Sequence, residues 1–218
     1  LEYYGQMKKC EGISPNAITF VYVLKACASI GASDHGEEIH ADIVRALKCY
    51  DQMQHEGISP NEVTFICILE ACSNLGAIDK GKEMHAEIDR QGLLGRNILV
   101  GNALLEMYAK CGLHSRAQEI FDELCIRDVV TWNTLISSYA QLGDNDTVVD
   151  LFNEMQQDDI LPNPVTFTIL LNACSHSGEL GKGEICFQAM SMEYDIIPNM
   201  EHYTCLVDLF GRVGHVEK

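Results

Sequence analysis

Apolar residues recur along the chain with the spacing of an α-helix, most clearly between residues 129 and 163. The segment VVTWNTLISSYAQLG carries Leu135, Ile136 and Tyr139 on one side of a helix that Gly143 ends. After this glycine an apolar stripe follows at i, i+3, i+4 and i+7, formed by Val148, Leu151, Phe152 and Met155. The acidic residues at 144 and 146 offer an N-cap for this second helix. The pattern predicts two amphipathic helices joined by a short turn.

This helix–turn–helix pattern repeats along the chain. Three stretches are near copies, and each follows a Pro-Asn pair: TFVYVLKACASIG from Thr19, TFICILEACSNLG from Thr64 and TFTILLNACSHSG from Thr166. Alignment on the aromatic residue gives repeats over 17–61, 62–97, 98–128, 129–163, 164–199 and 200–218, after the end of a truncated repeat over 1–16; the last repeat is also truncated. Repeats of this length stack, and each buries its apolar face against its neighbours. We therefore predict an all-α fold, a right-handed α-solenoid whose first helices line the inner face, without a sheet.

The repeat over 17–61 is irregular, since it has 45 residues where the other complete repeats have 31 to 36. Its first part matches the repeat that begins at 62, whereas its end, CYDQMQHEGISPN, matches the second helix of a 35-residue repeat. We interpret it as two half-repeats joined near Ala46 and Leu47, through a deletion, a gene-model error or fragmentation. One fused helix is expected around residues 36–54.

The formal net charge of −17 argues at first against nucleic acid, because nucleic-acid binders usually carry basic patches. The charge is unevenly spread, however. The predicted first helices hold five acidic residues against three basic ones, so most of the acid lies on second helices and loops. Acid in these places aids solubility and leaves the inner face nearly neutral. Nucleic-acid binding should then rest on stacking and base contacts, at about 1–3 kcal/mol per stacked base.

The ten cysteines point to buried, reduced thiols, because several share a repeat position, such as Cys27, Cys72 and Cys174. The sequence contains no C-x-x-C pair, which weakens a zinc or redox interpretation. His85-Ala86-Glu87 matches the H-x-E of zinc deaminases, but no P-C-x-x-C follows. We therefore predict no metal, no cofactor and no catalytic domain in these residues. The sequence shows no apolar run of membrane-spanning length and no signal peptide, and it opens on the end of a helix, so an N-terminal part is expected to be missing.

The repeats resemble those of pentatricopeptide repeat proteins of the plant organelle type. VVTWNTLISSYAQLGDNDTVVDLFNEMQQDDILPN is close to that family's 35-residue consensus, and the repeats at 62 and 98 are similar to its long and short variants. The order of lengths, 36, 31, 35 and 36, resembles the PLS subfamily. The resemblance implies binding of single-stranded organellar RNA, one base per repeat, in C-to-U editing or other RNA processing. It further implies a mitochondrial or chloroplast location and editing-factor proteins as partners, with no membrane and no small-molecule substrate.

In this family the fifth and the last residue of a repeat read the edge of one base, and the second residue sandwiches that base. The resemblance thus assigns base reading to Asn102 with Asp128, Asn133 with Asn163, Thr168 with Asn199, and Thr204. It assigns sandwiching to Leu99, Val130 and Val165. The three pairs would favour U, C (with U second) and A, respectively. An amide can donate and accept, as such reading requires, whereas the aliphatic Val21 and Ile66 at two fifth positions cannot hydrogen-bond a base.

Two alternatives stay open from the residues alone. The asparagines at fifth and last positions are also typical helix caps and turn residues. The array could bind protein instead of RNA, as tetratricopeptide scaffolds do, although their strict 34-residue period differs from the mixed lengths here.

Overall fold

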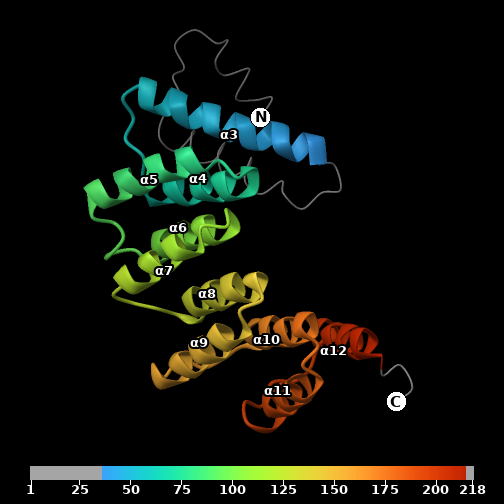
Figure 1. Ribbon diagram of the computed structural model, residues 1–218. Helices are drawn as coiled ribbons and strands as arrows, with labels where there is room; N and C mark the ends of the chain where they lie inside the picture. The colour runs from blue at the N-terminus through green and yellow to red at the C-terminus, as the bar shows by residue number, and fades with distance from the viewer. Residues whose placement is uncertain (1–35, 215–218) are drawn as a thin grey trace. The chain divides into compact units, whose positions relative to one another are not determined.

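The computed structural model describes residues 36–214, and all of their regular secondary structure is helical (Figure 1). The chain divides into two compact blocks, 1–125 and 126–218, which we call the N-terminal and the C-terminal block and describe separately. The N-terminal block contains α3 (Gly36–His55), α4 (Glu62–Leu75), α5 (Ile78–Gln91), α6 (Ile98–Lys110) and α7 (His114–Glu123). The C-terminal block contains α8 (Val129–Leu142), α9 (Asn145–Gln157), α10 (Pro164–Ser177), α11 (Leu180–Met192) and α12 (Met200–Val213). The truncated repeat over 1–16 and the first helix predicted for 17–61 lie outside the described residues.

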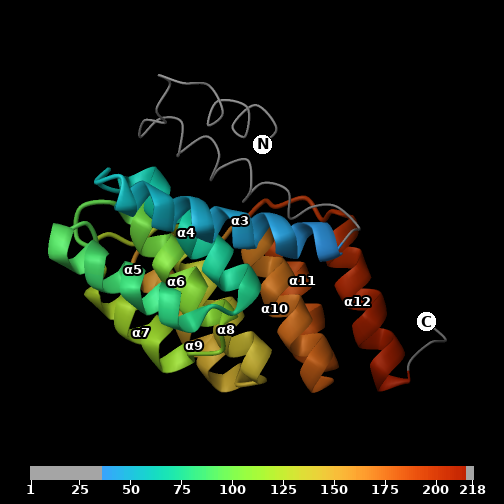
Figure 2. The ribbon, with the colours of Figure 1, turned by 90° about the horizontal axis from the view of Figure 1, so that it is seen from above.

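Helix pairs stack within each block, as the sequence predicts. Each first helix packs against the second helix of its own repeat: α4 on α5, α6 on α7, α8 on α9 and α10 on α11. Within each block, first helices also pack on one another: α4 packs on α6 in the N-terminal block, and α8 packs on α10 and α10 on α12 in the C-terminal block (Figures 1 and 2). Within a block, second helices also pack on the first helix of the next repeat, as α5 does on α6, α9 on α10 and α11 on α12. The predicted all-α class is confirmed, and the handedness of the solenoid stays a prediction.

In three of the helix pairs the core is built on an aromatic residue of the first helix. Phe65, Trp132 and Phe167 occupy equivalent positions of α4, α8 and α10, and each is at most 1% exposed. Of the stripe predicted on α9, Val148, Leu151 and Met155 are buried, and Phe152 is half-buried. Tyr203 of α12 departs from the expected pattern, because it is 51% exposed and packs at 5.5 Å, between ring centroids, against Phe187 of α11.

Glycines serve the stack in two ways. Gly76, Gly143 and Gly178 end α4, α8 and α10 in the left-handed conformation, with φ of 64°, 74° and 69°, as the helix-ending turns require. Gly81 and Gly183 lie inside the second helices α5 and α11, where a Cβ would overlap Met107 of α6 and Leu209 of α12. Helices of successive repeats therefore approach each other closely at these two positions, which the sequence analysis did not identify.

The irregular repeat contains one uninterrupted helix, α3, which runs through Ala46 and Leu47. Tyr50 and Met53 on this helix are fully buried, and α3 packs on α4. Asp51 is also joined to Lys80 of α5 by an ion pair of 2.9 Å. The end of the irregular repeat thus serves as a normal second helix for the repeat at 62, and the origin of the junction stays a prediction.

The cysteines of the described residues are all free thiols, and Cys49, Cys67, Cys72 and Cys205 are buried as predicted. Cys125 differs because it lies exposed in the connection after α7. Within residues 36–214, each helix is too short or too polar to traverse a lipid bilayer.

Candidate functional site

Two residues predicted to act as a pair meet where α8 packs on α10. Asn133 is the fifth residue of α8, and Asn163 is the N-cap of α10. The side-chain amide of Asn133 donates from Nδ2 to Oδ1 of Asn163 over 3.1 Å. The structure therefore brings together the fifth and the last residue of the repeat over 129–163.

Local sequence explains why α10 begins at this point. Asn163 is extended, with φ of −120° and ψ of 176°, and its Oδ1 accepts the backbone N–H of Thr166 over 3.0 Å. The Thr166 hydroxyl accepts the backbone N–H of Asn163 in return, over 3.1 Å, which completes a capping box. Pro164 occupies the first turn, where its missing N–H costs nothing. The alternative reading of this asparagine as a helix cap is thus confirmed, and the cap and the Asn133 contact coexist.

Thr166 also contacts Asn133 directly. Its hydroxyl donates to Oδ1 of Asn133 over 2.7 Å, and the threonine is fully buried. Asn133 itself is 7% exposed, so only one edge of its amide is open to solvent. The sequence analysis missed Thr166 as a site residue, although the Val-Thr pair before the aromatic recurs at residues 63–64, 130–131 and 165–166.

Exposed apolar side chains accompany this polar network. Val130 and Val165, the second residues of α8 and α10, are 52% and 55% exposed. Leu99 on α6 is 61% exposed, and Val63, at the same position of α4, is 41% exposed. The first turns of α6, α8 and α10 contain no acidic residue, although Asp128 caps α8. Uncharged polar groups beside exposed apolar groups suit a planar, partly polar ligand such as a base.

The other predicted residues of the preceding repeat lie in different blocks. Asn102 is buried on α6 in the N-terminal block, where it is 8% exposed. Asp128 caps α8 in the C-terminal block, where its Oδ1 accepts the N–H groups of Val130 and Thr131 over 3.0 and 2.9 Å. Base reading by Asn102 with Asp128 stays a prediction.

The third predicted pair has different contacts. The Thr168 hydroxyl turns back to its own helix and donates to the Pro164 carbonyl over 3.1 Å. Asn199 caps α12 and accepts the N–H of His202 over 3.2 Å. Thr204, on α12, donates its hydroxyl to the Met200 carbonyl over 2.8 Å. Thr168 and Asn199 are therefore bonded to other groups, and their role with RNA stays a prediction.

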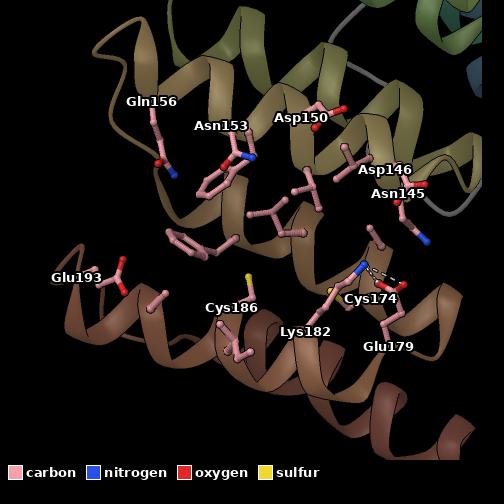
Figure 3. A pocket seen from close by; sticks show the side chains of 18 of the residues that line it. Asn145, Asp146, Asp150, Asn153, Gln156, Cys174, Glu179, Lys182, Cys186 and Glu193 are labelled. Carbon is pink, nitrogen blue, oxygen red and sulfur yellow. Dashed lines mark hydrogen bonds and ion pairs between the residues drawn. The ribbon is translucent and has the colours of Figure 1, made fainter.

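A separate cleft of about 600 Å³ lies between α9 and α11 of the C-terminal block (Figure 3). Its floor is apolar, and Val149 and Ile185 remain exposed there, at 42% and 69%. Burial raises the pKa of the Cys186 thiol in this cleft to about 12, so the sulfur is not a ready nucleophile. The single lysine at the rim, Lys182, pairs with Glu179. Carboxylates outnumber it there: Asp146, Asp150, Glu179 and Glu193.

Among residues 36–214, no three His, Cys, Asp or Glu side chains converge in a way that could hold a metal ion. His85, of the H-x-E sequence, contacts the Tyr108 hydroxyl through Nδ1 over 2.9 Å and lies against that ring. These contacts indicate that His85 packs between α5 and α6 as a structural residue.

Sequence comparison identifies the class of the repeats. The model of the PPR repeat family matches residues 127–176, and the model of the pentatricopeptide repeat domain matches residues 40–75. The model of the PPR repeat matches residues 102–129 and 165–193. One pentatricopeptide repeat-containing protein of Arabidopsis thaliana is 39% identical over the whole chain, which covers 25% of that relative. Another from this plant, mitochondrial by name, is 40% identical over the whole chain, which covers 33% of it. The chain belongs to the pentatricopeptide repeat family, and it spans a quarter to a third of these relatives.

Solved structures agree on the fold. The crystal structure of the pentatricopeptide repeat protein PPR10 from maize matches 98% of the chain with a TM-score of 0.71 and 23% identity, over 29% of its own length. PPR10 in complex with an 18-nucleotide psaJ RNA element matches 89% of the chain with a TM-score of 0.68 and 16% identity, over 28% of its own length. The likeness shows that the described helices adopt the pentatricopeptide repeat fold.

Proposed function

We propose that this chain recognises a specific segment of single-stranded RNA through its layer of first helices. The observation that carries the proposal is the contact of Asn133 with Asn163, flanked by the exposed Val130 and Val165. Two amides from consecutive first helices, α8 and α10, can address the edge of one base, while the valines contact its faces. The RNA complex of PPR10, which shares the fold, supports this direction.

The cellular role is the finer part of the proposal. The order of long, short and standard repeats supports a PLS-type array that directs C-to-U editing or other processing of an organellar transcript. The array would supply the address, and editing-factor proteins or another domain would supply the chemistry, since the matched family models all describe repeats. A mitochondrial or chloroplast location is supported by relatives whose names place them in mitochondria.

Filter binding to a panel of short RNA oligomers tests RNA recognition. We expect saturable binding with a preference for pyrimidine-containing RNA, lost in the double variant Asn102→Ala with Asn133→Ala, because each substitution removes a base-reading amide. Asn153→Ala is the matched control, since Asn153 is exposed on α9, away from the first helices. Equal binding by the wild-type chain and the double variant would reject the proposal.

A second candidate function, protein binding, is favoured by the cleft between α9 and α11. Its apolar floor and the excess of carboxylates at its rim complement an amphipathic helix that carries lysine or arginine beside apolar residues. Binding of a synthetic basic amphipathic peptide, abolished by Ile185→Asp without an effect on RNA binding, would support this function. Equal binding of the peptide by the variant would reject it.

A further inference from the structure

The hydrogen bonds around Asn163 permit only one arrangement of donors and acceptors. The backbone N–H of Thr166 can only donate, so the Asn163 side-chain atom 3.0 Å away must be the oxygen Oδ1. This oxygen also faces the side chain of Asn133 over 3.1 Å, so the facing atom of Asn133 must be the donor Nδ2. The backbone of α10 thereby fixes the orientation of the Asn163 amide, and Asn163 favours one of the two orientations of the Asn133 amide.

The Thr166 hydroxyl then holds the other atom of the Asn133 amide. This hydroxyl accepts the backbone N–H of Asn163 over 3.1 Å, so its single hydrogen is available for one acceptor. Oδ1 of Asn133 is the nearer acceptor, at 2.7 Å, against 3.2 Å for Oδ1 of Asn163. The carbonyl oxygen of Asn133 is consequently turned toward a buried threonine.

The two amides therefore offer a ligand mainly donors. Oδ1 of Asn163 accepts from the Thr166 backbone N–H and from Nδ2 of Asn133, and Oδ1 of Asn133 accepts from the Thr166 hydroxyl. What remains is the NH₂ group of Asn163 and one hydrogen on Nδ2 of Asn133. Such an edge matches cytosine, whose N3 accepts, better than uracil, whose N3–H donates.

Helix capping alone does not require this hydroxyl. The equivalent residue of α6 is Val100, and there Asn97 caps the helix by accepting the N–H groups of Leu99 and Val100 over 3.0 and 3.3 Å. The fifth residue of the repeat before α6 is Ile66, which has no amide to orient. The hydroxyl at position 166 thus has a use beyond the cap where an asparagine precedes it.

We propose that Thr166 is a positioning residue that determines base specificity: its hydroxyl holds the carbonyl oxygen of Asn133 away from RNA, so that the Asn133–Asn163 pair selects cytosine over uracil. The inference rests on the proposed function, in which this pair reads a base. It assigns part of the reading of one base to the third residue of the following repeat.

The test measures the affinity ratio for paired RNA oligomers that differ by C or U at one position. Scanning that position along the RNA, with Asn133→Ala as reference, locates the nucleotide that the pair reads. Thr166→Val should lower the C-to-U ratio there about three- to ten-fold, the worth of one hydrogen bond, because the freed carbonyl can accept the N3–H of uracil. Thr166→Ser, which keeps the hydroxyl, should retain the wild-type ratio. Thr64→Val removes an equivalent buried hydroxyl from the cap of α4 and should also retain it.

The outcomes separate the inference from the function on which it rests. If the wild-type chain shows no base preference at any position, both are wrong. If Asn133→Ala abolishes the preference and Thr166→Val leaves it at the wild-type ratio, RNA reading stands and the role of Thr166 is rejected. Circular dichroism checks that each variant is folded. If Thr166→Val does not fold, Thr166→Cys, whose thiol is a weaker donor than the hydroxyl, takes its place in the test.

Discussion

The two junctions of the C-terminal block begin alike and end differently. At both, an asparagine closes one repeat and caps the next first helix, and the residue three positions later completes a capping box. At the α8–α10 junction this residue is Thr166, and at the α10–α12 junction it is His202. The threonine joins the cap to the fifth residue of the preceding repeat, whereas the histidine joins it to the backbone. The third residue of a repeat therefore decides whether the fifth residue before it is linked to the cap.

The size and chemistry of the histidine ring explain this difference. Nδ1 of His202 accepts the backbone N–H of Asn199 over 3.0 Å, so the proton of the neutral ring is on Nε2. Nε2 then donates to the Pro164 carbonyl over 2.8 Å, and this oxygen also accepts the Thr168 hydroxyl over 3.1 Å. At the α10–α12 junction the polar atoms of the histidine ring therefore link α12 to α10 and do not contact the fifth residue of the preceding repeat.

The largest expected effect is a loss of stability in His202→Ala, because this substitution removes the link between α12 and α10. The ring is fully buried, and its removal leaves a cavity, an Asn199 N–H without its acceptor, and a Pro164 carbonyl that keeps only the Thr168 hydroxyl as a side-chain donor. We expect the free energy of unfolding to fall by about 2–4 kcal/mol. Urea unfolding measures this loss, and hydrogen exchange should place it in α12. His55→Ala, at an exposed histidine of α3, is the control, and an equal, small loss in both variants would contradict this account.

The next effect compares the fifth residues in RNA binding. Asn133→Ala should lower the affinity for cytosine-containing RNA about ten-fold, because it removes a reading amide and releases Asn163. Thr168→Ala should change the affinity less than about two-fold, because its hydroxyl is already bonded to Pro164. Fluorescence anisotropy with one labelled oligomer measures both variants. A larger effect from Thr168→Ala would show that the second junction also reads a base, in agreement with the family resemblance.

A transplant of residues sharpens the comparison. The double variant Thr168→Asn with His202→Thr gives the second junction the fifth and third residues of the first, beside the existing cap Asn199. We expect a preference for cytosine at one additional nucleotide, about three-fold in affinity, since one new amide pair is formed. The same anisotropy scan detects it, and Thr168→Asn alone should give a weaker preference. If the double variant and the wild-type chain have the same base preference at every nucleotide, the fifth and third residues are not sufficient to create a new base-reading pair.

The contrast between the junctions also shows what a sequence can predict. Repeat period and apolar spacing predicted the helices, and the helix-ending glycines placed the turns, because these depend on local chemistry. Family resemblance predicted the meeting of Asn133 and Asn163. Thr166 and His202 were missed because their partners lie 33 and 38 residues away in the sequence, on the preceding first helix. The exposure of Tyr203 was missed for a related reason, since the burial of an equivalent position depends on which helices cover it.

The smallest effect concerns a second polar link that only the α10–α12 junction has. The Ser175 hydroxyl donates to Oδ2 of Asp208 over 2.5 Å, and Arg212 donates to the same oxygen over 2.8 Å, whereas the previous repeats have Ala140 and Asn172 at the positions of Ser175 and Asp208. The hydrogen bond from Ser175, and next that from Arg212, lower the pKa of the Asp208 carboxyl below its ordinary 3.8. A lowered folded pKa means that the link contributes stability above the unfolded value and loses it as the pH falls through the folded one.

Asp208→Asn should therefore lower the urea midpoint slightly at pH 7, and the gap to the wild-type chain should close as the pH falls through the lowered folded pKa of Asp208, where its carboxyl becomes neutral. The effect is small because the carboxylate is exposed and water screens it. In a Ser175→Ala background the gap at pH 7 should shrink, since the main cause of the lowered pKa is gone. A gap of the same size at pH 7 and in acid would mean that Asp208 acts through packing and not through its charge.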